Sequence, residues 1–260
     1  MIRALFTSAS GMNAQELQLN VISNNLANVN TGGYKKSQTQ FEDLFYANLR
    51  AVGAETVGGN MVPVGIQVGM GVRPTAVTKI FTQGDYISTG NDLDWAIEGR
   101  GFFKIIRDGT EYYTRAGSFK IDGDGYIVTS NGDRLQPEFT IPPETVSLEI
   151  DSSGLLSAID EEQTTIATMQ ITLHDFINPA GLKAMGSNNF LPTEASGDPR
   201  EENPGTNGMG TITQYSLESS NVNVTDEMVN LIITQRAFES NSKGVTTADQ
   251  LLEISNNLVR

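Results

Sequence analysis

Cysteine is absent from this sequence of 260 residues, and histidine occurs only once, at position 174. Without cysteine the chain has no disulfide bonds, no thiolate metal ligands and no cysteine nucleophile. His174 follows an alternating run that ends at Leu173, and a lone histidine at a strand end is usually a surface or capping residue. We therefore expect no metal site and no cofactor.

Long apolar runs are also missing. No stretch approaches the roughly 20 apolar residues that a membrane-spanning helix requires. The first eight residues, MIRALFTS, lack the apolar segment of a secretory signal peptide. We expect no direct membrane insertion, and either a cytoplasmic location or export by a route that reads no cleavable signal.

Basic residues are few. The 17 lysines and arginines stand against 31 acidic residues, which gives a formal net charge of -14 at pH 7. The only adjacent basic pair is Lys35-Lys36. Because such a chain repels the phosphate backbone, we expect no nucleic-acid partner.

Two short motifs resemble parts of known sites, and neither is complete. Ser240 and Lys243 have the Ser-x-x-Lys spacing of penicillin-binding enzymes, but the companion motifs are absent. Residues 122–125, DGDG, resemble the start of a calcium loop but lack the remaining oxygen ligands. A tight hairpin turn explains this run better. The sequence therefore predicts no catalytic residues and no enzyme activity.

The chain instead carries a heptad row of apolar residues near each end. The first row lies on a helix that we expect to end at Gly32-Gly33, and it comprises Leu5, Met12, Leu19 and Leu26. The second follows the expected N-cap Thr225 and comprises Leu231, Phe238, Val245 and Leu252. Such spacing favours a coiled coil. We predict that the two helices pair antiparallel and that both rows form a subunit interface; the alternative is two ordinary amphipathic helices on a globular core.

The N-terminal helix is unusually poor in charge. Between residues 1 and 34 the only charged side chains are Arg3 and Glu16. A helix that faces solvent normally carries charges on its outer face. We infer that the free monomer covers this helix poorly and that copies of the same chain cover it.

The middle of the chain differs from both ends. Apolar residues from Phe41 to Leu49 suggest a short helix. Residues 53–71 form a Gly-rich stretch in which Ile66, Val68 and Met70 alternate, as in an extended arm or an edge strand. Residues 85–218 show regular turns and two hairpin signals, at Asp108-Gly109 and at residues 122–125, a pattern typical of a small barrel or sandwich. We expect a long loop from 186 to 210. The predicted fold class is α+β, with a helical domain (1–34 and 222–260), a connector and arm (35–84) and a mainly-β domain (85–221).

Four strings of residues make the chain resemble a known family. Residues 20–35 (NVISNNLANVNTGGYK) resemble the N-terminal signature of flagellar rod and hook proteins, and residues 220–239 resemble their C-terminal signature. Residues 93–103 and 113–119 resemble β-domain motifs of the longer members. The family motif at the N-terminus comprises Asn20, Asn24, Asn25, Asn28, Asn30, Gly32 and Gly33.

This resemblance implies a structural subunit of the flagellar basal body. The Gly-rich arm, the string at 220–224 and the length are most similar to members that build the distal rod; a proximal-rod or short hook-type paralogue is the alternative. The resemblance implies a helical homopolymer that transmits torque and encloses the export channel. The implied partners are proximal-rod proteins, the hook protein, the periplasmic and outer-membrane ring proteins and the flagellar export apparatus.

A third possibility is an unrelated enzyme or binding module with a β core. The chain ends separate it from a tube subunit. An enzyme is expected to keep its function without residues 1–30 and 225–260, whereas a tube subunit is expected to lose assembly.

Overall fold

The computed structural model describes residues 2–50 and 64–258. The chain divides into two compact units. The first comprises Met1–Leu26, Ser37–Thr78 and Asn223–Arg260, and the second comprises Ala27–Lys36 and Lys79–Val222. With a helix towards each end and a mainly-β middle, the fold is α+β, as the sequence predicted.

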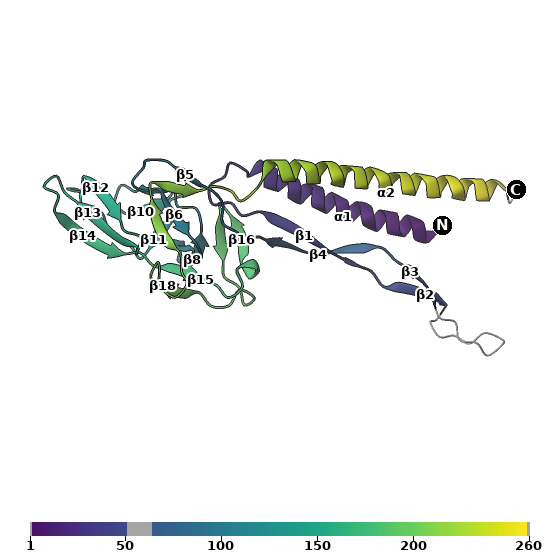
Figure 1. The fold of residues 1–260 in the computed structure, drawn as a ribbon, viewed down its shortest axis with the longest axis horizontal. Coiled ribbons are helices and arrows are strands. Elements are labelled where there is room, and N and C mark those ends of the chain that lie inside the picture. The colour runs from purple at the N-terminus through teal and green to yellow at the C-terminus, as the bar shows by residue number, and fades with distance from the viewer. Residues whose placement is uncertain (1, 51–63, 259–260) are drawn as a thin grey trace. The chain divides into compact units, whose positions relative to one another are not determined.

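Two long helices dominate the first unit, α1 (Ile2–Ala27) and α2 (Val224–Leu258), and they lie side by side (Figure 1). α1 ends at Ala27 and does not continue to Gly32-Gly33. The reason is a turn in which Thr31 donates two hydrogen bonds to Asn28, from its N–H to the carbonyl and from its hydroxyl to the side chain, both 3.2 Å long. Such local hydrogen bonds compete with helix formation.

Asn223, and not Thr225, caps the start of α2. Its Oδ1 accepts hydrogen bonds from the backbone N–H groups of Thr225 (2.9 Å) and Asp226 (3.5 Å). A side-chain oxygen in this position satisfies donors that have no partner inside the helix. Asp226 and Glu227 lie in the first turn, where negative charge interacts favourably with the helix dipole.

The first unit also contains two small sheets. β1 (Ser37–Asp43) pairs with β4 (Val72–Lys79), and β2 (Tyr46–Arg50) pairs antiparallel with β3 (Ile66–Gly69). The strand predicted from Ile66 and Val68 is confirmed. The short helix predicted from Phe41 to Leu49 is wrong, because the backbone of this segment pairs with strands that come later in the chain. Residues 51–63 of the predicted arm lie outside the described residues.

Short strands build the second unit. Its largest sheet has the order β16-β17-β8-β7-β11-β10-β9, with the bounds β7 Phe103–Arg107, β8 Thr110–Thr114, β9 Phe119–Ile121, β10 Ile127–Thr129, β11 Arg134–Gln136, β16 Lys183–Gly186 and β17 Asn189–Leu191. A three-stranded sheet contains β12 (Ser147–Ile150), β13 (Leu155–Ile159) and β14 (Thr165–Gln170). The remaining strands pair as β5 (Tyr86–Ser88) with β20 (Ser216–Glu218), β6 (Trp95–Glu98) with β19 (Thr211–Gln214), and β15 (Leu173–Asp175) with β18 (Arg200–Glu202).

Both predicted hairpins of this unit are present. Asp108 and Gly109 turn between β7 and β8 with φ of 52° and 76°, the positive values that a two-residue hairpin turn requires. Residues 122–125 form the turn between β9 and β10, with the N–H of Gly125 bonded to the carbonyl of Asp122 at 3.0 Å.

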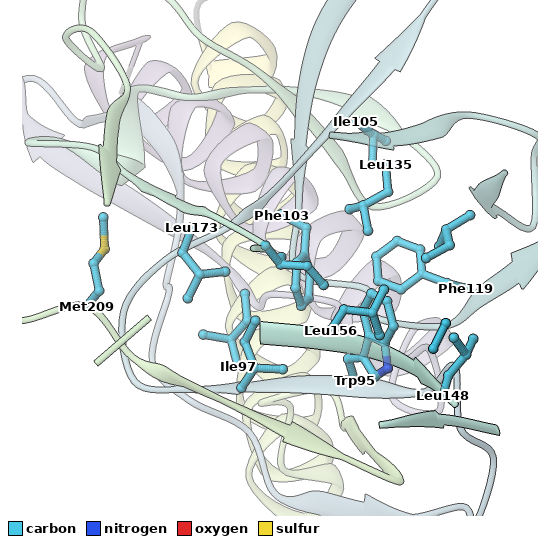
Figure 2. Packing of buried hydrophobic residues seen from close by; sticks show 14 residues of the cluster. Trp95, Ile97, Phe103, Ile105, Phe119, Leu135, Leu148, Leu156, Leu173 and Met209 are labelled. Carbon is cyan, nitrogen blue, oxygen red and sulfur yellow. The ribbon is translucent and has the colours of Figure 1, made fainter. Parts of the chain in front are cut away.

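An apolar core holds these sheets together (Figure 2). Trp95, the only tryptophan, is fully buried, and its ring lies 5.2 Å from that of Phe119. Figure 2 shows Leu148 and Leu156 close to Trp95. A second cluster comprises Phe102, Tyr113, Phe176, Leu182 and Phe190.

Two predictions for this unit are wrong. Residues 186–210 are not one long loop, because they contain β17 and β18. His174 is not on the surface but is 3% exposed, in the middle of β15, with its ring 5.4 Å from that of Tyr113. The aromatic cluster around it shields the ring from water.

Candidate assembly surface

The two helices contact each other in a constant antiparallel register. Asn25 of α1 donates a hydrogen bond of 3.2 Å to Glu227 of α2. Fourteen residues earlier in α1, Gly11 faces Asn241, which is 14 residues later in α2. Ser8, three residues before Gly11, faces Gly244, three residues after Asn241. The register therefore holds over nearly five turns of helix.

Most of the residues buried on the two helices are small or polar, and Ile22 is the exception. The buried residues of α1 are Gly11, Ala14, Ile22 and Asn25, and those of α2 are Glu227, Thr234 and Ala248. Residues 227, 234, 241 and 248 are seven apart, so they form a heptad row that apolar spacing does not reveal. The predicted interface residues lie beside this contact and are half-buried: Leu5, Met12, Leu19, Leu26, Leu231, Phe238, Val245 and Leu252.

Asn25 has a further role in the first unit. Its Nδ2 donates to the carbonyl of Ser37 (2.8 Å), and its Oδ1 accepts from the N–H of Ser37 (2.9 Å). With its bond to Glu227, one buried amide ties the end of α1 both to α2 and to the start of β1. This explains one asparagine of the family motif by geometry.

Large apolar side chains remain exposed on the same helices. Met228, Val229, Ile232 and Ile233 of α2 are each at least half exposed and repeat at intervals of four residues, so they form one patch. The others on the helices are Ile2, Phe6, Val224, Leu251 and Ile254. Soluble monomers rarely expose continuous apolar patches, and such patches usually mark interaction sites.

The strands of the first unit also expose large apolar side chains. Phe45, at the bend between β1 and β2, is 92% exposed, and it borders a pocket of about 370 Å³ that Glu42, Tyr46 and Arg73 also line. Exposed apolar residues along the strands include Leu49, Ile66, Val68 and Val77. Two-stranded sheets are marginally stable in water on their own, so this surface is suited to a partner.

The remaining motif residues lie at different depths. Asn20 and Asn30 are exposed, and so is the side chain of Asn24. Asn28 forms the turn with Thr31 described above. The carbonyl of Gly32 accepts a hydrogen bond of 2.8 Å from Asn188 in the second unit, to which both residues belong.

A buried ionic cluster lies next to these glycines, inside the second unit. Nζ of Lys35 lies 2.5 Å from Oε1 of Glu218, and NH1 of Arg115 lies 3.5 Å from Oε2. Burial lowers the pKa of Lys35 below its ordinary value, and the charge of Glu218 opposes that shift. Burial also lowers the pKa of Arg115. Lys35 and Arg115 belong to two of the family-like strings, which are far apart in the sequence, and Glu218 joins them.

Other features offer no catalytic arrangement in the parts of the chain that the structure describes. Ser240 and Lys243 are both exposed on α2. No group of three or more potential metal ligands gathers among the described residues. Within residues 2–50 and 64–258, no helix is both long and apolar enough to span a membrane.

Comparison with known families matches three segments of the chain. Residues 5–35 match the flagella basal body rod protein family, residues 96–158 the D1 domain of the flagellar hook protein FlgE/F/G family, and residues 213–258 the C-terminal domain of flagellar basal body rod FlgEFG proteins. These segments contain most of α1, part of the β core and the whole of α2.

Curated relatives match over their whole length. The flagellar basal-body rod protein FlgG of Borreliella burgdorferi is 47% identical over 264 residues, which cover 100% of both chains. FlgG of Buchnera aphidicola subsp. Schizaphis graminum is 44% identical over 255 residues, or 97% of this chain and 98% of the relative. FlgG of Bacillus subtilis is 39% identical over 269 residues.

The chain belongs to the family of flagellar basal-body rod and hook proteins, which are structural proteins and not enzymes. Within this family, the relatives that are 39–47% identical over their length are rod proteins of the FlgG, or distal-rod, type. The family and the type inferred from the sequence are thereby confirmed.

Proposed function

We propose that the chain is a subunit of the distal rod that polymerises with copies of itself into a helical tube. The observation that carries this proposal is the exposed apolar patch of α2, centred on Met228, Val229, Ile232 and Ile233. A monomer leaves this patch in water, whereas neighbouring copies bury it. Burial of apolar surface contributes about 25 cal/mol per Å², so a few such side chains per contact favour association.

In this tube the helices form the inner layer as a coiled coil. The half-buried rows that contain Leu5 and Leu231 support this arrangement, because a residue covered on one side only can pack against a second helix on the other. The inner layer encloses the export channel. The second unit, which contains most of the strands and is called the β unit below, faces outwards.

The strands of the first unit act as an arm that reaches a neighbouring subunit. The exposure of Phe45 and of the residues along β2 and β3 supports this role. Contact through two layers and an arm resists bending better than contact through helices alone. The tube then transmits torque.

The chain works in the basal body, where it crosses the periplasm as part of the rod. Its partners are other copies, proximal-rod proteins, the hook protein and the surrounding ring proteins, and the flagellar export apparatus delivers it. A proximal-rod or short hook-type role is the second candidate. Its support is a weaker match, 28% identity over 280 residues to the flagellar hook-basal body complex protein FlhP of Bacillus subtilis.

Sedimentation and electron microscopy of two proteins test polymerisation. The first is the full chain, and the second lacks residues 1–26 and 223–260, which leaves the segment 27–36 of the β unit in place. We expect tubes from the full chain only. Trp95 fluorescence reports whether the shortened protein keeps its core. A full-length chain that stays monomeric at high concentration contradicts the proposal.

A further inference from the structure

Two short segments connect the β unit to the helices, and they are bonded to each other. The first is residues 28–36, which follow α1, and the second is residues 218–222, which lead from the end of β20 towards α2. The N–H of Gly33 donates to the carbonyl of Glu218 at 2.8 Å. The N–H of Lys36 donates to Oδ1 of Asn221 at 2.7 Å. The chain thus enters and leaves the β unit at one place.

Asn221 and Lys35 also donate hydrogen bonds to backbone carbonyls elsewhere in the same unit. Nδ2 of Asn221 donates to the carbonyls of Ile80 (2.8 Å) and Thr82 (3.1 Å). Nζ of Lys35 donates to the carbonyl of Thr82 at 2.9 Å. Backbone on both sides of the entry point is therefore fastened to the segment 80–82.

The carboxylate of Glu218 forms the centre of this arrangement. Its Oε1 accepts from Nζ of Lys35 at 2.5 Å and from the N–H of Gly84 at 3.1 Å, and its Oε2 lies 3.5 Å from Arg115. Arg115 in turn donates to the carbonyl of Gly99 at 2.8 Å. The side chains of Lys35 and Glu218 are fully buried. Separation of such a pair leaves uncompensated charge in a medium of low polarity, which is strongly unfavourable.

The backbone at the entry point admits only glycine. Gly33 has φ of +70°, and a Cβ there would lie 2.7 Å from the backbone nitrogen of Ala116. Residues with a side chain rarely adopt this conformation, and here the neighbouring backbone also blocks it. Gly33 therefore lets the entering segment approach the string 113–119 closely enough for Lys35 to reach Glu218.

We propose that Glu218 and Asn221 form a mechanical clasp that closes the β unit where the chain enters and leaves it. Force that reaches the β unit through the two helices arrives at residues 28–36 and 218–222, so it loads these hydrogen bonds before the sheets. Several bonds are loaded together, and the clasp opens only when the buried ionic cluster is broken. Its value to a rod that carries torque rests on the proposed function, but its existence does not.

Force spectroscopy of single full-length chains tests the clasp. Because the sequence has no cysteine, two introduced cysteines hold the handles without competition. Ala27→Cys with Thr225→Cys, both exposed, pulls at the entry and exit points. Asp108→Cys with Glu161→Cys, exposed at two hairpin turns, pulls the same unit in another direction.

Glu218→Gln is expected to shorten the lifetime of the β unit at constant force at least tenfold when the force acts at Ala27 and Thr225. When the force acts at Asp108 and Glu161, we expect Glu218→Gln to change the lifetime only by the factor by which it changes the unfolding rate without force. Leu156→Ala, in the core, serves as the control and is expected to give the same factor in both geometries. Equal factors in both geometries for Glu218→Gln would overturn the proposal, because Glu218 would then act only through general stability.

Asn221→Ala provides a second test that does not alter the charges. It removes the acceptor for the N–H of Lys36 and is expected to act in the same direction-dependent way. If Glu218→Gln fails to fold, this variant alone decides. All measurements use monomers, so failure of tube formation would refute polymerisation and leave the clasp standing.

Discussion

Gly11 of α1 faces the side chain of Asn241 in α2 so closely that a Cβ on Gly11 would lie 2.8 Å from Nδ2 of Asn241. The helices meet here without a side chain from α1 between them. Gly11 is also buried, in the middle of the contact. A glycine costs about 1 kcal/mol relative to alanine inside a helix, so close approach is the compensating gain.

We expect Gly11→Val to force the helices apart and to prevent assembly. Trp95 fluorescence is expected to show an unchanged β core. Gly123→Ala is the matched control, because a Cβ at Gly123 meets nothing within 4 Å. The combined change Gly11→Ala with Asn241→Ala removes both the glycine and the side chain it faces, and we expect it to restore tubes. Tubes formed by Gly11→Val itself, seen by electron microscopy, would show that the close approach is not needed.

The half-buried heptad rows give a second prediction. Leu19→Asp and Leu252→Asp each place a charge beside the helix contact, and we expect both to abolish polymerisation while the β unit stays folded. The exposed positions of the same helices provide controls, Asn13→Asp and Ser255→Asp, for which we expect normal tubes. Sedimentation separates the outcomes. If the leucine variants also assemble, these rows do not form the subunit interface.

The sequence predicted the helices better than it predicted their contact. Apolar spacing identified both elements through rows such as that of Leu231, but the most buried row of α2 contains Glu227, Thr234 and Ala248. Small and polar residues have no apolar signal, and their burial depends on what the opposite helix presents. Nothing in the local sequence says that Gly11 will face Asn241.

The ionic cluster was hidden for a different reason. Lys35 and Glu218 are 183 residues apart, and the sequence marked Lys35 only as part of a basic pair. The family resemblance identified strings that contain Lys35 and Arg115, but it did not show that both residues contact Glu218. His174 was misplaced because its burial among aromatic rings depends on β15 lying next to β7, which brings its ring close to that of Tyr113, and local sequence does not show this.

A third prediction concerns the exposed Phe45. Because its side chain is 92% exposed, Phe45→Ser is expected to change the free energy of unfolding of the monomer by less than about 0.5 kcal/mol. If the arm binds a neighbour, the same change weakens tube formation, which a raised critical concentration for assembly would reveal. Ile177→Ser, at an equally apolar and 79% exposed site of the second unit, is the control. An equal effect of both variants would point to general solubility and not to the arm.

The pairing of Lys35 with Glu218 gives a fourth prediction. Lys35→Met is expected to cost about 3–5 kcal/mol in the free energy of unfolding, because it leaves a buried carboxylate with only Arg115 as a charged partner. Glu218→Gln is expected to be similarly destabilising. The double variant is expected to cost clearly less than the sum of the two, and denaturant titration of all four proteins measures the difference. Simple additivity would show that the two residues do not interact.

The last prediction follows from the burial of His174. Burial lowers its pKa below the ordinary value of about 6.5, against the opposing charge of Glu201, whose Oε2 lies 3.8 Å from Nε2. Lys104 also lowers this pKa, and Glu111 raises it. Within the described residues, Nδ1 has no hydrogen-bond partner. The folded protein therefore favours the neutral ring.

The unfolded chain binds a proton to this histidine at a higher pH than the folded chain does. As pH falls below about 6.5, stability is therefore lost, by up to about 1.4 kcal/mol per pH unit, until the pKa of the folded state is reached. Above pH 6.5 the contribution is constant. His174→Phe keeps an aromatic ring beside Tyr113 and Phe176 and removes the titration. The difference between wild type and variant, measured by urea denaturation from pH 5 to 8, cancels the effect of the carboxylates. We expect this difference to shift in favour of the variant as pH falls; a constant difference would show that the buried ring is protonated as readily as in the unfolded chain.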